Sequence, residues 1–261
     1  MSTDTKKYTS KLANARILVI GGSSGIGYSV AEASLEYGAS VIISSSQKSR
    51  VDAAIDRLLQ TYPSAQGRLS GYACDLSSAT LEANVEHLFS QCGGKLDHVA
   101  FTAGDKLSVM PLENANLEKI QKAGMVRFFA PLFVAKYAKK YLNPGPASSI
   151  TLTTGAVSEK PIKDWSVVAS FATGLHGMVR NLALDLAPIR VNLVSPGAVI
   201  TPLWDGTPQA QRETMMEGMR KDTTTGEVGK PEDVAESYLY LMKDWNCTGS
   251  VIDTNGGCLL T

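Results

Sequence analysis

A glycine-rich run near the start of the chain has the spacing of an anion-binding turn. Gly21-Gly22-Ser23-Ser24-Gly25-Ile26-Gly27 lies between an apolar strand-like run and a helix-length segment. Glycines allow a tight turn and a close backbone approach to a ligand, and the N–H groups and dipole at the start of the helix favour a pyrophosphate. Although glycines also serve ordinary turns, this placement predicts dinucleotide binding.

A second polar cluster follows the apolar run Val41-Ile42-Ile43. It contains Ser44-Ser45-Ser46, and the cations Lys48 and Arg50 come directly after it. An acidic residue at this place binds the ribose of NAD and repels a 2′-phosphate. The hydroxyls of Ser45 and Ser46, together with Lys48, can instead cradle a phosphate. The cluster therefore favours NADP(H), and the alternative is a solvated surface turn.

The elements that must position these residues alternate along the chain. Short continuous apolar strands separated by helices indicate a parallel sheet that is covered on both faces, and right-handed crossovers make it doubly wound. We expect an α/β Rossmann fold of about seven strands in one domain, residues 1–261. The expected strands are 17–20, 41–43, 69–74, 97–102, 150–153, 191–194 and 250–252, and the expected helices are 26–37, 51–60, 81–90, a long pattern ending near 141, 165–186 and one opened by Pro231.

Composition excludes several classes of protein. The 25 Lys and Arg balance the 25 Asp and Glu, so no basic field favours nucleic acid or an anionic membrane. Four cysteines without a CxxC pair argue against a disulfide scaffold or a zinc site, and His87, His98 and His176 have no metal-ligand spacing. Without a long apolar run or a signal-type leader, we expect a soluble, cytoplasmic protein with no metal.

The chain resembles the short-chain dehydrogenase/reductase family over almost its whole length. The glycine run resembles the family's TGxxxGIG, with Ile20 in place of Thr, and 101–104 (FTAG) stands where the family has NNAG. Residues 182–187 (LALDLA), 189–192 (IRVN) and 195–197 (SPG) match its helix–strand–loop signature. The resemblance implies that cofactor contacts come from the glycine run and from Asp75, Leu76, Ala103, Gly104, Pro196, Gly197, Val199 and Thr201.

The resemblance also exposes a loss in the expected active site. The family works with a Tyr and a Lys four residues apart on one helix face, a Ser, and an Asn from another helix. Alignment from 182–187 places the Tyr at Val168 and the Lys at Ala172. The Asn position falls at Arg127, and the Ser position falls at Thr154 or Gly155. No YxxxK occurs from 150 to 187.

Reduction of a ketone needs a proton at the developing alkoxide, and a positioned acid contributes about 10²–10⁴ in rate. An iminium ion already carries positive charge and yields a neutral amine on hydride addition. A site without Tyr therefore suits an iminium or an activated alkene better than an ordinary alcohol.

The remaining polar candidates each have a functional and a structural interpretation. Arg127 could bind substrate or pair with another protein group. Asp164 could stabilise an iminium, shuttle a proton or cap the following helix, and Trp165 could stack on substrate or pack in the core. Asp105 faces the expected cleft or serves a turn.

Two further segments border the expected cleft. Lys160 and Lys163 lie on a loop beside it and are expected to be solvated. The segment 202–228 is expected to close over substrate, with its Met-rich stretch 215–219 forming either an apolar lid or a packing helix.

The sequence thus predicts an NADPH-dependent reductase that acts on a small-molecule imine or iminium. Similarity to Tyr-less, Arg-containing fungal members of the family implies alkaloid-type biosynthesis and a stereocontrolled cyclisation of the Diels–Alder or Pictet–Spengler type. The alternatives are a carbonyl reductase with another proton donor and a silent NADP-binding regulator. The resemblance also implies a homodimer or homotetramer through helices at 113–141 and 165–187, with 255–260 near the contact.

Overall fold

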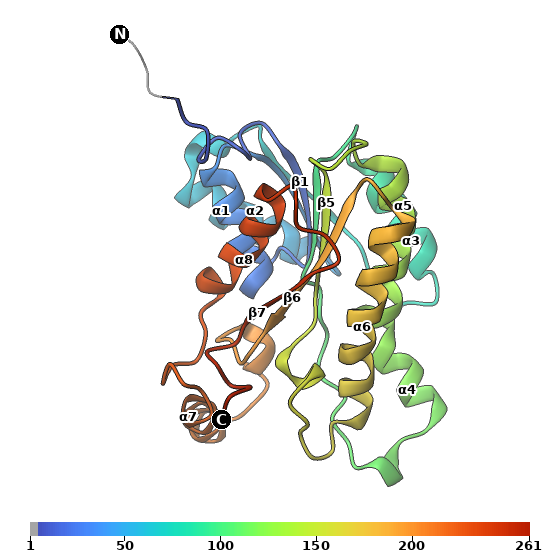
Figure 1. The fold of residues 1–261 in the computed structure, drawn as a ribbon, viewed down its shortest axis with the longest axis vertical. Coiled ribbons are helices and arrows are strands. Elements are labelled where there is room, and N and C mark those ends of the chain that lie inside the picture. Colours follow the sequence, from blue (N-terminus) through green and yellow to red (C-terminus); the bar gives the residue numbers. More distant parts are fainter. Residues whose placement is uncertain (1–4) are drawn as a thin grey trace.

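The computed structural model describes residues 5–261 and has one seven-stranded parallel sheet with the order β3-β2-β1-β4-β5-β6-β7. The strands are β1 (Arg16–Ile20), β2 (Ser40–Ser45), β3 (Leu69–Ala73), β4 (His98–Phe101), β5 (Ser149–Thr153), β6 (Arg190–Pro196) and β7 (Val251–Thr254). The predicted doubly wound α/β fold is confirmed, because helices cover both faces of this sheet (Figure 1).

The helices divide into two layers and a group at one end of the molecule. α1 (Gly25–Glu36), α2 (Lys48–Thr61) and α8 (Pro231–Lys243) pack on one face. α3 (Leu81–Gln91), α5 (Ala130–Tyr141) and α6 (Ser166–Asp185) pack on the other. α4 (Leu117–Gly124) and α7 (Gln209–Lys221) lie at the lower end in Figure 1. Short 3₁₀ turns occur at Pro63–Ala65, Leu112–Asn114, Ala156–Ser158 and Pro202–Trp204.

Continuous apolar runs form the central strands because both sides of each strand are covered. Ile17, Leu18, Val19 and Ile20 in β1 are all at most 1% exposed. Ile20 at the end of β1 is in register with Ser44 of β2 and Phe101 of β4. The loops that follow these three strands therefore start side by side at the carboxyl ends of the strands, where ligands of open α/β sheets bind.

The long helical pattern that ends near residue 141 is interrupted. Leu112–Asn114 forms a separate 3₁₀ turn, and Asn116 caps α4 by accepting a hydrogen bond from the Lys119 backbone N–H at 2.9 Å. A π-helical turn, Met125–Phe129, then joins α4 to α5. The expectation of one regular helix over 113–141 is therefore wrong, and the wider turn carries Arg127. Such turns often occur at functional sites because they redirect side chains.

Candidate active site

The glycine run packs against two other loops at the carboxyl end of the sheet, one after β4 and one after β6. Gly21 has φ +96°, and a Cβ there would lie 2.5 Å from the Ala103 backbone nitrogen. Gly25 has φ +53°, and a Cβ there would lie 3.0 Å from Cγ2 of Thr201. Ser24 precedes α1 without a side-chain capping bond, and the first turn of α1 has no acidic residue. Open N–H groups and the absence of acidic charge fit the pyrophosphate of a dinucleotide.

The end of β2 lies beside this cradle. The Ser23 hydroxyl donates to the Ser45 hydroxyl at 2.9 Å, which joins the glycine run to the second strand. Ser46 is exposed. Lys48, expected to hold a phosphate, instead has its Nζ 2.8 and 2.7 Å from the two carboxylate oxygens of Asp52.

The other residues expected to contact a cofactor lie in loops at the same carboxyl end of the sheet. Asp75 Oδ1 accepts from the backbone N–H of Ser77 at 2.9 Å and from its hydroxyl at 2.7 Å, which fixes the turn after β3, while Leu76 is buried. Pro196 ends β6, and the Gly197 N–H donates to Thr254 of β7. Val199 forms an isolated bridge with Gly229.

Arg127 is paired with a carboxylate that sequence reasoning did not assign to it. Its Nε lies 3.1 Å from Asp105 Oδ1, and Nη2 also donates to the Asp105 backbone oxygen. The guanidinium lies against Gly104, where a Cβ would come within 2.8–2.9 Å of three of its atoms. Burial lowers the pKa of Arg127, and the Asp105 charge opposes that shift. The Arg127 side chain remains 30% exposed, although its guanidinium is held by Asp105.

The positions expected for the Tyr and Lys hold Val168 and Ala172 on α6, and both side chains are half-buried. The Thr154 hydroxyl, which follows β5, donates to the backbone oxygen of Ala172 at 2.8 Å. Its hydrogen is therefore engaged, while its oxygen can still accept a hydrogen bond. This geometry makes Thr154 a better acceptor than proton donor.

A tyrosine hydroxyl does occur near the end of β5, but it is directed into the core. Tyr238 on α8 is fully buried and hydrogen-bonded to the Thr153 hydroxyl at 2.5 Å. Thr153 donates its one hydroxyl hydrogen to the Phe101 backbone oxygen, so it accepts from the Tyr238 hydroxyl. Burial raises the pKa of the Tyr238 phenol well above its usual range. Tyr238 therefore tightens the core between β5 and α8 and does not replace the missing acid.

Asp164 does not cap α6. The helix begins at Ser166 with Trp165 as its N-cap residue, and no side chain closes this end. Asp164 adopts φ +66°, and its backbone oxygen accepts from the Met110 N–H at 3.1 Å. Within residues 5–261 its half-buried carboxylate has no hydrogen-bond partner, and Trp165 beside it is half-buried. The strained turn thus presents an unengaged carboxylate at the start of the helix that carries Val168.

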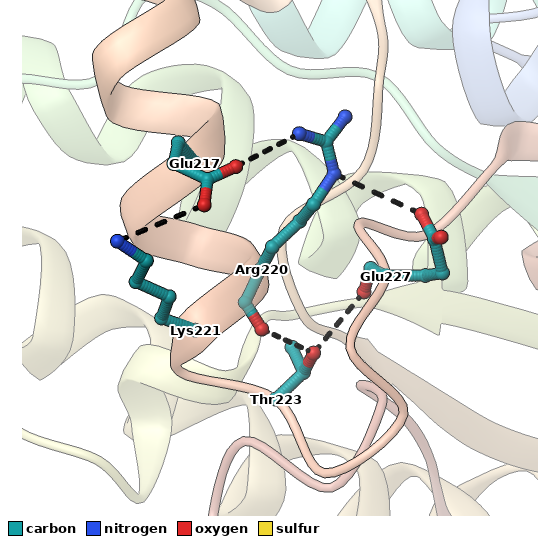
Figure 2. A network of polar contacts seen from close by, with 5 residues as sticks. All are labelled: Glu217, Arg220, Lys221, Thr223 and Glu227. Carbon is teal, nitrogen blue, oxygen red and sulfur yellow. Dashed lines mark hydrogen bonds and ion pairs between the residues drawn. The ribbon is translucent and has the colours of Figure 1, made fainter.

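The segment expected to form a lid carries an open cavity of about 680 Å³, which is lined by residues between Ile200 and Arg220. Thr201, Trp204 and Met216 are among its lining residues, and α7 has no buried residue of its own. Figure 2 shows exposed ion pairs at the end of α7: Arg220 contacts Glu217 at 3.2 Å and Glu227 at 3.8 Å, and Lys221 contacts Glu217 at 3.7 Å. A helix that buries little is suited to move over a ligand.

Lys160, expected to be solvated, donates to the backbone oxygen of Cys258 at 2.7 Å. It therefore ties the loop after β5 to the segment 255–260. His176 contacts Ser158 at 3.0 Å, and His98 is buried against Ser149 at 2.9 Å. Over residues 5–261, no group of His, Cys, Asp and Glu has the geometry of a metal site. In the same range, no helix is both long and apolar enough to cross a bilayer.

Comparisons with known proteins agree with this geometry. The model of the SDR-like Rossmann domain matches residues 8–261. The short-chain dehydrogenase/reductase fsr5 of Gibberella fujikuroi is 52% identical over 260 residues, covering 98% of each chain. The chain therefore belongs to the short-chain dehydrogenase/reductase family.

Two solved structures extend the comparison. The MalC reductase/Diels-Alderase of Malbranchea aurantiaca is 40% identical, with a TM-score of 0.92 over 97% of this chain and 100% of that one. A small-chain dehydrogenase in complex with NADPH is 29% identical, with a TM-score of 0.79 over 95% of this chain and 100% of that one.

Proposed function

We propose that this chain is an NADPH-dependent reductase of secondary metabolism and that its substrate is an iminium ion or a similarly activated, alkaloid-like intermediate. The observation that carries this proposal is the apolar pair Val168 and Ala172 at the positions of the family's Tyr and Lys, with the Thr154 hydrogen engaged elsewhere. A substrate that needs a proton at an alkoxide has no phenol donor on α6. A substrate that already carries positive charge needs none at this step.

The cofactor assignment is supported by the open α1 N-terminus, the hydroxyls of Ser23 and Ser45, and similarity to the dehydrogenase solved with NADPH. When bound, NADPH would supply a hydride to the iminium carbon, and the C=N π electron pair would move to nitrogen to leave a neutral amine. No proton is gained or lost in this step, so the chain must only orient the substrate and stabilise its charge.

The charges of the site suit a cation. Arg127 alone would repel an iminium, but its pair with Asp105 carries no net charge. Asp164 contributes a carboxylate without a partner in the described residues. We assign to Asp164 the stabilisation of the iminium and to Trp165 the stacking on its aromatic part. Arg127 and Thr154 bind a substrate carbonyl or N–H group, the first as donor and the second as acceptor.

A stereocontrolled cyclisation is a second activity of the same pocket. It is favoured by the 40% identity to a protein described as a reductase/Diels-Alderase. A cavity of about 680 Å³ lies between the turn after β6 and α7, in the segment expected to close over substrate. Cyclisation depends mainly on orientation of the reacting groups, which can lower an activation barrier by about 7–11 kcal/mol. Comparing the stereochemistry of the product formed with and without the protein tests this activity.

The reductase proposal is tested by NADPH consumption with a panel of cyclic imines, quinones and ketones. We expect turnover on imines that falls by about 10- to 100-fold in Asp164→Ala and in Arg127→Ala, with NADPH binding retained. Efficient reduction of simple ketones, with no reaction on imines, would indicate a carbonyl reductase with another donor. Tight NADPH binding with no turnover on any substrate would indicate a regulator.

We also propose a homodimer or homotetramer formed through α5 and α6. Leu132 on α5 is 42% exposed and Leu184 on α6 is 77% exposed, which leaves apolar surface on both helices. Light scattering after size exclusion should give two or four times the monomer mass of 27.8 kDa. A monomer at micromolar concentration would contradict this assembly.

A further inference from the structure

Arg57, on α2, places a guanidinium next to the glycine run. It lies in the third turn of α2, which packs beside α1 on the same face of the sheet (Figure 1). Its guanidinium carbon is 4.6 Å from the centroid of the Tyr28 ring on α1. Its Nη2 donates to the backbone oxygen of Ser23 at 2.9 Å. A ring face and a carbonyl thus hold the guanidinium plane beside the cradle.

Ser23 connects this cation to the end of β2. Its hydroxyl donates to the Ser45 hydroxyl at 2.9 Å, so α2, the glycine run and β2 meet at one residue. Among residues 5–261 the Arg57 guanidinium has no carboxylate within 4 Å, and its bond to Ser23 uses one of five N–H donors. The remaining donors of this exposed side chain are available to an anion.

The other cations near β2 are differently placed. Lys48 is paired with both carboxylate oxygens of Asp52, and its side chain is 79% exposed. Arg50 is exposed and makes no hydrogen bond or ion pair in the part of the chain that the structure describes. Neither side chain is anchored against the glycine run. Of these three cations, Arg57 is the one whose side chain contacts the glycine run.

We infer that Arg57 binds the 2′-phosphate of NADPH and thereby sets the preference of this chain for NADPH over NADH. This inference rests on the NADPH dependence proposed above. A guanidinium suits the role because its planar fork can present two parallel N–H groups to phosphate oxygens. Tyr28 and Ser23 fix its plane in advance, and the hydroxyls of Ser45 and Ser46 complete the phosphate site.

The test measures binding without turnover. The probes are 2′,5′-ADP, which carries the 2′-phosphate, and 5′-AMP, which lacks it, followed by NADPH and NADH. Titration calorimetry compares the wild-type chain with Arg57→Ala, Arg57→Lys, Lys48→Ala and, as a control for loss of a surface charge, Arg180→Ala. We expect Arg57→Ala to weaken the binding of 2′,5′-ADP and of NADPH by roughly 10- to 100-fold, because a hydrogen-bonded charge pair is lost. Binding of 5′-AMP and NADH should stay unchanged, and Arg57→Lys should restore only part of the loss.

The outcomes separate this inference from the proposed function. If the wild-type chain prefers the phosphorylated probes and Arg57→Ala keeps that preference, the role of Arg57 is refuted while NADPH dependence stands. If Lys48→Ala loses that preference and Arg57→Ala keeps it, the role of Arg57 is likewise refuted while NADPH dependence stands. If the wild-type chain binds the two kinds of probe equally, both the NADPH preference and the role of Arg57 are refuted.

Discussion

Adding one methyl group at Gly104 should move Arg127 without removing it. A Cβ at Gly104 would lie 2.8 Å from Nη2, whereas ordinary van der Waals contact begins at 3.4 Å, so the guanidinium must retreat by 3.4 − 2.8 = 0.6 Å. The Asp105 contact at 3.1 Å limits how the side chain can respond. A misplacement of about 1 Å in a positioned group can cost about 100-fold in rate. For Gly104→Ala we therefore expect kcat on a cyclic imine to fall by about 10- to 30-fold.

The assay is NADPH consumption at saturating substrate, with NADPH affinity measured separately. Gly177→Ala is the control, because a Cβ at that position on α6 meets nothing within 4 Å. Its kcat should match that of the wild-type chain. If Gly104→Ala also keeps the wild-type kcat, the position of the guanidinium does not matter for the reaction. If it loses NADPH binding in proportion to kcat, the methyl group acts on the cofactor and not on Arg127.

Three further predictions concern the residues that hold the site. Asp105→Asn leaves the half-buried Arg127 charge unpaired and should lower the free energy of unfolding by about 1–2 kcal/mol in urea titrations, between the values for exposed and buried pairs. Arg190→Met removes a buried guanidinium that donates to the carbonyls of Pro146, Leu241, Met242 and Cys247, and should cost about 3–5 kcal/mol; a loss below 1 kcal/mol would contradict that role. Burial lowers the pKa of His98 to about 3, so the unfolded chain takes up a proton below about pH 6.5 that the folded chain refuses. Stability should therefore fall by about 1.4 kcal/mol per pH unit between pH 6.5 and 3, and His98→Gln should remove that part of the acid sensitivity.

The sequence predicted the centre of the sheet well because strands such as β1 and β4 contain continuous apolar runs that are fully buried. The start of α1 was predicted within one residue for a similar reason, since the glycines at 21 and 25 fix the turn before it. The helical hydrophobic pattern over 113–141 did not predict the break between α4 and α5. A hydrophobic period reports which face is buried, but it does not show a single widened turn such as Met125–Phe129.

Side-chain partners were the least predictable part of the site. Asp105 and Arg127 are 22 positions apart, and only the fold shows that Asp105 neutralises Arg127. The pairing of Lys48 with Asp52 could have been found, because oppositely charged residues four apart on a helix contact each other. Arg57 gives no such local signal. Its relation to Ser23 depends on how α2 packs against α1.

The pairing of Arg127 also resolves a conflict that the sequence alone leaves open. An arginine in place of the family's helix Asn suggests a positive site, and a positive site is a poor one for an iminium. Because the Arg127–Asp105 pair carries no net charge, we propose that the carboxylate of Asp164 sets the preference of the site for a cation. The Asp105→Asn and Asp164→Ala variants should therefore change substrate preference in the same direction, away from cations and toward neutral carbonyl compounds. A shared shift of this kind separates an electrostatic role from loss of packing, which would lower turnover on every substrate alike.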